Sequence, residues 1–493
     1  MRYQNITLYF VLLFIVLSCS QPKKSEKTID TSIFEEEIQQ LKAYFKIPGM
    51  AVLVKKKDEI IYEEYLGKSD VKNNIDVDTI TLFPIASLTK VFTSITILKL
   101  AEEHKVLLED SLTKYFPKLA LGDSVKLKHV LSHTSQGTPG KNFYYNYRFG
   151  ALTRVIAETS DSTFDEAVHK NIIDPLSLRH TFLLNDSTQL KTRKEPFAQP
   201  YIFEEQIKDG FVDYGASASA GIVSTARDLA VLDNALDQNL LISEASKNLM
   251  FTPFQSHLPY GYGIFSETFN NTKLIWAYGQ YDCYSSLFLK VPTHDLTLIL
   301  LANNNLMSDP ARLIYSNATS SLFVMSFLKN FAFEQSSLPL FETEQTSTDT
   351  IPSVIMREKL RAQALAASFM ARFDTDEMKT STALLQRIFS EYPNYLEYAD
   401  LTLLHNLSFL KEVALHKDLG TFNEFDPQIE AIGKMLLQKD ADNPYANYYL
   451  GGFYDKKGDT VQAKTHYERI INAKNFSRNW YTAEAQNWLD TNK

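Results

Sequence analysis

Ser87 and Lys90 have the residue types and the spacing of a nucleophile and its base. They stand at the start of an apolar segment, Leu88 to His104, whose apolar side chains recur at intervals of three and four without glycine or proline. We expect this segment to be helical, with Lys90 one turn after Ser87 on the same face. A serine hydroxyl needs a base to attack, and lysine can be that base only where burial or nearby positive charge lowers its pKa.

The Ser-x-x-Lys spacing is weak by itself, because it recurs elsewhere in the chain. The other pairs are Ser20/Lys23, Ser69/Lys72, Ser111/Lys114, Ser326/Lys329 and Ser408/Lys411. Ser87 differs in context, since it is expected to cap the helix, and a helix N-terminus directs free N–H groups towards a developing oxyanion. The alternative is a plain helix cap followed by a solvated lysine.

Tyr144-Tyr145-Asn146 contains a second spacing with chemical potential, Tyr-x-Asn. Tyr144 could relay a proton between a serine and a leaving group, and Asn146 could donate to a substrate carbonyl. This spacing also recurs, at Tyr315/Asn317, Tyr392/Asn394 and Tyr445/Asn447. The alternative is an aromatic residue beside a turn asparagine.

Short β-prone segments are expected to position these residues. Segments 51–54 and 59–62 are predicted to form paired strands. Segments 285–291 and 296–302 are apolar and are predicted to be neighbouring buried strands, separated by Pro292 and Asp295.

The order of the motifs resembles the β-lactamase-related serine hydrolases, a family that includes class C β-lactamases, low-molecular-weight penicillin-binding proteins and related esterases. The matching segments are Phe83-x-Ile85-Ala86-Ser87-x-Thr89-Lys90, Val130-Leu131-Ser132-His133-Thr134-Ser135, Tyr144-x-Asn146, Pro175-Leu176, Gly221-Ile222-Val223-Ser224-Thr225-Ala226-x-Asp228-Leu229 and Tyr260-Gly261-Tyr262-Gly263. The resemblance covers Ile33 to Phe331. It implies the α/β (α+β) fold of β-lactamases and penicillin-binding proteins, with an antiparallel sheet flanked by helices and a helical lobe.

The resemblance also implies a role for each site residue. Ser87 would attack an amide or ester carbonyl and form an acyl-enzyme. Lys90 and Tyr144 would move protons, and Asn146 would orient the substrate. The backbone N–H groups of Ser87 and Gln280 would form the oxyanion hole. His133 is expected to have a packing and hydrogen-bonding role, because the family uses that string structurally.

The family's third motif, Lys/His-x-Gly, falls on Ala277-Tyr278-Gly279. Tyr278, Gly279 and Gln280 are therefore expected to bind substrate, and Gly279 would permit close backbone approach. Ala277 lacks the expected side chain, and one charge-assisted hydrogen bond is worth about 1.5–3 kcal/mol, roughly a ten- to hundredfold change in rate. Trp276, Tyr278 or Arg312 could compensate.

The N-terminal segment is predicted to be a lipoprotein signal peptide, residues 1–19. An apolar run, Ile6 to Leu17, ends at Cys19 in a sequence that resembles a lipobox, which would make Cys19 the acylated residue. An ordinary secretory signal is the alternative. A polar tether, residues 20–32, would then hold the protein to the membrane of the cell envelope, facing the periplasm or the cell exterior. Cys283 is expected to be a packing residue.

The rest of the chain is predicted to form two domains, residues 33–331 with the hydrolase motifs and residues 353–493 with helices only. Residues 332–352 are rich in Ser, Thr, Glu and Pro and are expected to be a linker. Near the C-terminus, five residues have the spacing of a tetratricopeptide helix pair: Leu450, Gly451, Tyr454, Ala463 and Tyr467. A plain helical appendage is the alternative.

Composition and charge argue against some classes of function. The net charge of −9 and the lack of a long basic block disfavour nucleic-acid binding. No spacing typical of metal ligands or of a phosphate loop is present, so no cofactor is predicted. The leading hypothesis is a membrane-tethered serine hydrolase acting on a D-alanyl peptide, a β-lactam or a small ester. The alternative, motivated by Ala277, is a non-catalytic binding or sensing protein whose C-terminal helices dock a protein partner.

Overall fold

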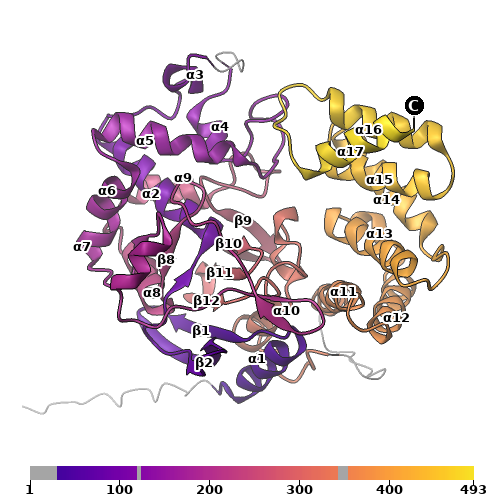
Figure 1. Cartoon of the computed structure of the whole chain (residues 1–493), viewed down its shortest axis with the longest axis horizontal. Helices are drawn as coiled ribbons and strands as arrows, with labels where there is room; N and C mark the ends of the chain where they lie inside the picture. The colour runs from indigo at the N-terminus through magenta and orange to yellow at the C-terminus, as the bar shows by residue number, and fades with distance from the viewer. Residues whose placement is uncertain (1–29, 119–123, 342–352, 493) are drawn as a thin grey trace, which may run out of the picture. The chain divides into compact units, whose positions relative to one another are not determined.

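The computed structural model of the 493-residue chain describes residues 30–118, 124–341 and 353–492. Within it, Thr31–Lys493 forms one compact unit (Figure 1). The predicted signal peptide, Cys19 and nearly all of the predicted tether lie outside the described residues, so lipid anchoring stays a prediction. The described helices include none with the length and apolar character needed to cross a membrane.

The centre of the fold is a seven-stranded sheet in the order β3-β2-β1-β12-β11-β10-β9, in which every neighbouring pair is antiparallel. Its strands are β1 (Gly49–Lys56), β2 (Glu59–Asp70), β3 (Ile75–Asp76), β9 (Phe265–Phe269), β10 (Thr272–Tyr281), β11 (Tyr284–Val291) and β12 (Leu296–Ala302). The two strand pairs expected from the sequence are confirmed as β1–β2 and β11–β12.

Each face of the sheet packs against its own helices, because successive strand residues point to opposite sides. Val52 and Val54 of β1 join one hydrophobic cluster together with α1 (Ser32–Tyr44) and α10 (Leu322–Phe327). Ala51 and Leu53 join the other cluster. That second cluster includes α2 (Thr89–Glu102), α8 (Ala226–Asp237) and the helical lobe.

The helical lobe is built mainly from α4 (Leu127–Leu131), α5 (Leu152–Ser160) and α6 (Phe164–Val168), which bury their apolar side chains with those of α2. A small sheet in the order β4-β8-β5 lies at the start of the α2 segment. Its strands are β4 (Phe83–Pro84), β5 (Phe182–Leu183) and β8 (Ile222–Ser224). The backbone N–H of Ile85 donates to the carbonyl of Ile222 (2.9 Å), which fixes the segment that leads into Ser87.

The C-terminal region is helical, as expected, and Figure 1 shows it in orange and yellow beside the sheet. Its helices are α11 (Ser353–Met370), α12 (Asp376–Glu391), α13 (Leu401–His416), α14 (Asp426–Lys439), α15 (Pro444–Lys456), α16 (Thr460–Asn472) and α17 (Trp480–Thr491). The predicted helix pair is present as α15 and α16, which approach closely at Gly451: a Cβ there would lie 2.8 Å from the Tyr467 ring.

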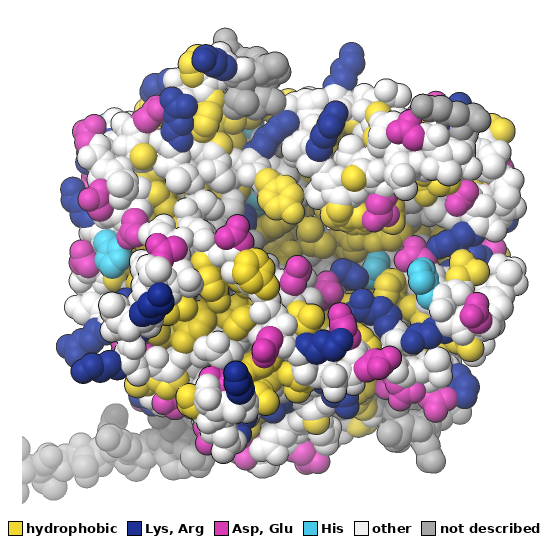
Figure 2. All heavy atoms as spheres, viewed as in Figure 1, with side chains coloured by type: hydrophobic (Ala, Val, Ile, Leu, Met, Phe, Trp, Pro, Cys, Tyr) yellow, Lys and Arg dark blue, Asp and Glu magenta, His cyan; other side chains and the backbone are white. Residues whose placement is uncertain are grey.

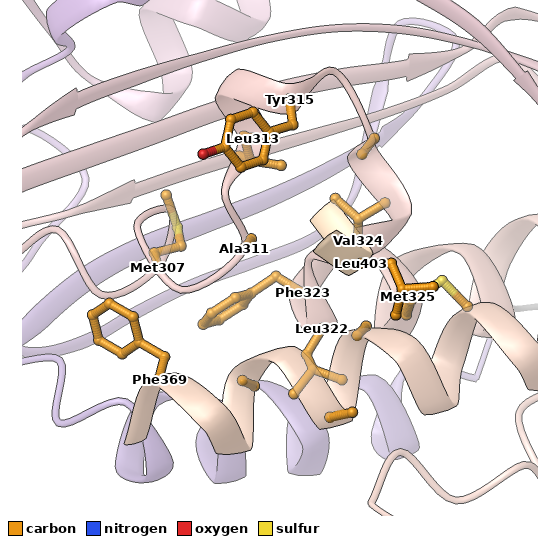
Figure 3. Close-up of a cluster of buried hydrophobic side chains, with 14 of the residues drawn as sticks. Met307, Ala311, Leu313, Tyr315, Leu322, Phe323, Val324, Met325, Phe369 and Leu403 are labelled. Atoms are coloured by element: carbon orange, nitrogen blue, oxygen red, sulfur yellow. The ribbon is translucent and has the colours of Figure 1, made fainter. Parts of the chain in front are cut away.

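The helical region shares a hydrophobic core with the sheet region. In Figure 3, Phe369 of α11 and Leu403 of α13 lie among side chains of the segment that follows β12, including Met307, Leu313 and Phe323. Leu338 and Leu340, from the first part of the predicted linker, are buried in the same cluster, and residues 342–352 lie outside the described residues. The predicted domain boundaries stay predictions.

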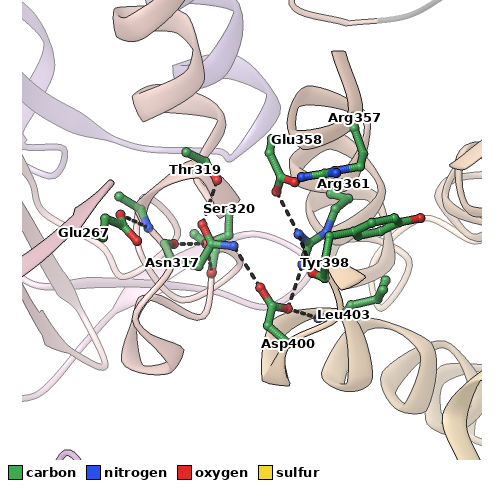
Figure 4. Close-up of polar contacts among 12 residues, drawn as sticks. Glu267, Asn317, Thr319, Ser320, Arg357, Glu358, Arg361, Tyr398, Asp400 and Leu403 are labelled. Atoms are coloured by element: carbon green, nitrogen blue, oxygen red, sulfur yellow. Dashed lines mark hydrogen bonds and ion pairs between the residues drawn. The ribbon is translucent and has the colours of Figure 1, made fainter. Parts of the chain in front are cut away.

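Polar contacts join the same two regions (Figure 4). Asn317 Nδ2 donates to a carboxylate oxygen of Asp400 (3.0 Å), whose other oxygen accepts from Arg361 (2.7 Å) and from the backbone N–H of Leu403 (2.9 Å). Arg361 also pairs with Glu358 at 2.8 Å. These bonds, most of them partly buried, link α11 and α13 to the segment that follows β12.

Candidate active site

Ser87 and Lys90 form the predicted pair. The Lys90 ammonium nitrogen lies 3.0 Å from Ser87 Oγ and donates to the carbonyl of Ser219 at 3.0 Å. The expectation that Ser87 caps the helix is wrong: Ser87 lies in a 3-10 turn, Ala86–Leu88, and α2 begins at Thr89 without a side-chain cap. Ala86 before it has a left-handed backbone (φ 46°), and Ser87 Oγ bonds to Lys90 rather than to helix N–H groups.

The environment of Lys90 favours the neutral amine. The side chain is only 3% exposed, and burial lowers its pKa from the ordinary 10.5 to about 7. Its hydrogen-bond partners are a hydroxyl and a carbonyl, both neutral. The rings of Tyr145 and Phe149 lie 5.0 and 5.5 Å from the nitrogen. At neutral pH a large fraction of Lys90 can therefore accept the proton of Ser87.

The structure places the two adjacent tyrosines in different surroundings. The Tyr144 hydroxyl donates to Asp440, which directly follows α14, and the Tyr144 ring packs on Phe476 at 4.9 Å. Tyr145 instead lines the cavity that contains Ser87. Burial raises the pKa of Tyr145, and a hydrogen bond with Ser87 opposes that rise. The Tyr-x-Asn pattern led to Tyr144, but the tyrosine brought to the nucleophile is Tyr145.

Asn146 lines the cavity, as expected, and is held by its neighbours. Its Oδ1 accepts from the backbone N–H of Arg148 (3.0 Å), and its Nδ2 donates to the carbonyl of Tyr144. Its backbone N–H donates to His133 Nδ1 (3.2 Å). The His133 ring is buried and packs on Tyr145 at 4.3 Å, in agreement with a packing and hydrogen-bonding role.

The third motif lies on β10, next to the turn that carries Ser87. A Cβ on Gly279 would lie 1.9 Å from the carbonyl oxygen of Ile85, so only glycine allows this approach. Ser286 of β11 also donates to that carbonyl (2.8 Å). Ala277 shares a strand face with Gly279 and is buried, so its methyl group offers no donor and no charge at the position where the family carries Lys or His.

Tyr278 and Gln280 line the same cavity, and Gly279 supports it from the strand. The Gln280 side chain is already occupied: its Nε2 donates to Asp309 (3.2 Å), and its Oε1 accepts from Ser308 (3.0 Å). This arrangement leaves the backbone of Gln280, rather than its amide, for contact with substrate. Asp309 in turn pairs with Arg312 at 2.8 Å.

The cavity has a volume of about 730 Å³, within the range of small-molecule sites. Figure 2 shows a hollow on the face of the molecule in view, lined by hydrophobic side chains, in yellow. Most of the lining residues were not identified from the motifs, among them Tyr145 and Ser219, which both lie beside Lys90. Tyr145 could have been found from the tyrosine doublet, and Ser219 from its position two residues before Gly221. Ser219 Oγ is buried without a hydrogen-bond partner.

Cys283 is a buried free thiol, as expected for a packing residue. Over the described ranges, no group of three or more His, Cys, Asp or Glu side chains is arranged to hold a metal ion.

Comparisons with known proteins agree with this arrangement. A family model described as Beta-lactamase matches residues 34–318. Protein flp of Staphylococcus aureus (strain MW2) is 24% identical over 57% of this chain, and the match spans 64% of flp, less than two thirds of that protein. The putative penicillin-binding protein PbpX of Bacillus subtilis (strain 168) is 27% identical over 49% of this chain and 68% of its own.

A solved structure shows the same fold. The octameric penicillin-binding protein homologue from Pyrococcus abyssi aligns with a TM-score of 0.54 and 21% identity, over 58% of this chain and 76% of its own. The family match covers the sheet, the helical lobe and the Ser87–Lys90 pair, and it ends before α11. The chain therefore belongs to the beta-lactamase family.

Proposed function

We propose that the protein is a serine hydrolase that cleaves an amide or ester bond through an acyl-enzyme on Ser87. The observation that carries this proposal is the 3.0 Å contact between Ser87 Oγ and a buried lysine whose pKa is about 7. Membership of the beta-lactamase family supports serine-hydrolase chemistry in general. The substrates we propose are a D-alanyl peptide, a β-lactam or a small ester.

In the acylation step, Ser87 Oγ attacks the carbonyl carbon and its proton passes to the neutral amine of Lys90. A carbon–oxygen bond forms, and the carbonyl oxygen becomes an oxyanion that the backbone N–H groups of Ser87 and Gln280 would stabilise. When the bond to the leaving group breaks, a proton returns to that group. Tyr145 is the proposed relay because it lines the cavity beside Ser87 and Lys90. Water then hydrolyses the ester by the same path in reverse.

The test is covalent labelling of the full chain with a fluorophosphonate or penicillin probe, with the labelled peptide identified by mass spectrometry. We expect the label on Ser87 and its complete loss in Ser87→Ala. Ser94→Ala is the matched control, since Ser94 lies on the same helix and is buried, and its hydroxyl makes no hydrogen bond. An unlabelled wild-type protein, or a label that survives Ser87→Ala, would overturn the proposal.

A pair of tyrosine variants tests the assignment of the relay. Tyr145→Phe should lower the labelling rate by about 10²–10⁴-fold, the range for loss of a general acid–base group, whereas Tyr144→Phe should leave it near wild type. The reverse order would return the role to Tyr144.

The second candidate is a binding or sensing protein with weakened catalysis, and Ala277 is the observation that favours it. This candidate predicts that a peptidoglycan fragment binds equally well to wild type and to Ser87→Ala, with no turnover by either.

A further inference from the structure

The helical C-terminal region contributes side chains to the wall of the Ser87 cavity. Tyr445 of α15, together with Asn479 and Trp480 at the start of α17, lines the same cavity as Ser87 and Lys90. Tyr445 is buried, whereas Trp480 is 44% exposed, so much of its indole is open to a ligand. The family match ends at residue 318, so all three of these residues lie outside it.

The position of Trp480 is fixed by bonds between the segment before it and the hydrolase motifs. Asn475 Nδ2 donates to the carbonyl of Gly137 (2.8 Å), and the Asn475 carbonyl accepts from Arg148 (2.9 Å). The backbone N–H and hydroxyl of Ser477 both donate to Gln136 Oε1, at 2.7 and 2.6 Å. Gln136, Gly137 and Arg148 lie on either side of Tyr145 and Asn146 in the sequence. Their hydrogen bonds therefore fix the start of α17 relative to the residues of the candidate active site.

The Trp480 ring is also packed from behind. It lies edge-on to Tyr448 at 4.9 Å and to Tyr481 at 5.6 Å, and Tyr481 packs in turn on Tyr445 at 5.4 Å. Asn479 caps α17 and accepts from the backbone N–H of Trp480 (2.8 Å). A ring supported in this way loses little freedom when a ligand binds, which favours affinity.

A second connection between the helical region and the cavity runs through Arg312, which also lines it. Arg312 Nε donates to Nε2 of His405 on α13 (3.0 Å), and His405 Nδ1 bonds to the hydroxyl of Tyr449 on α15 (2.8 Å). Burial and the neighbouring Arg312 hold the pKa of His405 well below its usual range, so the ring is neutral and Nδ1 carries the proton. Arg312 also forms an ion pair with Asp309, and Asp309 accepts a hydrogen bond from the side-chain amide of Gln280. The helical region thus contacts further residues that line the Ser87 cavity.

We propose that the helical region is part of the active site, and that Trp480, with Tyr445, forms a subsite for an aromatic or other flat apolar group in the non-reacting part of the substrate. The inference rests on the proposed function, since it needs Ser87 to be the reacting group. Aromatic rings of the hydrolase region, those of Tyr147 and Tyr281, line the same cavity. A flat apolar group would bury against such rings and gain the additional attraction of an aromatic pair.

The experiment uses two reversible ligands that differ by one phenyl ring, methylboronic acid and benzylboronic acid. Ser87 Oγ adds to the boron, which becomes tetrahedral as the hydroxyl proton passes to Lys90, and no group leaves. The dissociation constant of each is measured by protection of Ser87 from the fluorophosphonate probe, in full-length wild type, Trp480→Ala and Trp488→Ala. Trp488 is the matched control, because it lies on the same helix but packs on Tyr467.

We expect wild type to bind benzylboronic acid more tightly than methylboronic acid, and Trp480→Ala to reduce that preference about tenfold, the size of effect that an aromatic contact supplies. Trp488→Ala and the ring-retaining Trp480→Phe should keep the preference. The inference is overturned if wild type shows no preference, or if Trp480→Ala keeps it. Absence of probe labelling in wild type would instead contradict the proposed function. Melting temperatures identify any variant that fails to fold.

Discussion

Lys90 and a pair of other buried lysines, Lys55 and Lys290, differ in whether a carboxylate lies beside the amine, and at Lys90 and Lys290 this difference decides the direction of the pKa shift. Lys90 is buried beside a hydroxyl and a carbonyl, and burial lowers its pKa to about 7. Lys55 of β1 and Lys290 of β11 are equally buried, but both pair with Asp233 of α8. Burial also acts to lower the pKa of Lys290, yet Asp233 and Asp237 outweigh it and raise the pKa. Burial lowers the pKa of Lys90 strongly because no carboxylate in the described part of the chain opposes it, whereas at Lys290 two carboxylates reverse the effect of burial.

The largest effect on activity is expected when the amine of Lys90, which has no carboxylate partner among the described residues, is removed. Lys90→Met should lower the rate of Ser87 labelling by about 10²–10⁴-fold, because the general base is lost. The fold should keep its stability, since no carboxylate depends on Lys90. Labelling kinetics and thermal melting measure the two effects. A variant that labels at the wild-type rate would show that Lys90 is not the base.

For Lys55 and Lys290, which are paired with Asp233, we expect a loss of stability without a loss of labelling. Asp233→Asn leaves Lys55 and Lys290 buried without their shared carboxylate, and breaking a buried ion pair costs about 3–5 kcal/mol. Chemical denaturation should show this loss, while the folded variant labels Ser87 normally. Unchanged stability would mean that the three-residue cluster at Asp233 does not need its charge.

A smaller effect is expected from restoring the third-motif side chain. Ala277→His adds a donor beside the Ser87 turn and should raise the labelling rate by about ten- to hundredfold, the value of one charge-assisted hydrogen bond. Ala277→Val is the control for added volume and should not accelerate labelling. An Ala277→His variant no faster than wild type would indicate that other residues have replaced the motif.

Features set by neighbours in sequence could be predicted, and features set by distant contacts could not. The Ser87–Lys90 contact follows from a spacing of three residues at a helix start, and the strand pairs follow from apolar runs separated by turn residues. The choice between Tyr144 and Tyr145 depends on Asp440, which lies 296 residues along the chain from Tyr144. Tyr144 matches the Tyr-x-Asn motif, but its hydroxyl bonds to Asp440 of the helical region.

The role of the helical region was the least predictable part of the site. The periodicity of 353–493 indicates helices, but nothing local to Trp480 shows that it lines the Ser87 cavity. That position results from the hydrogen bonds of Asn475 and Ser477 to the hydrolase motifs. The same holds for the cluster at Asp233, whose lysines come from two strands far apart in sequence.

The pH dependence of Ser87 labelling tests the central claim most directly. Because only the neutral amine of Lys90 accepts the proton, the labelling rate should rise with pH through a midpoint of about 7 and then level off. Lys90→Met should lose this dependence together with most of the rate. A wild-type rate that is independent of pH between about 5 and 9, or that rises with a midpoint near the ordinary lysine pKa of about 10.4, would contradict a buried, unpaired Lys90 acting as the base.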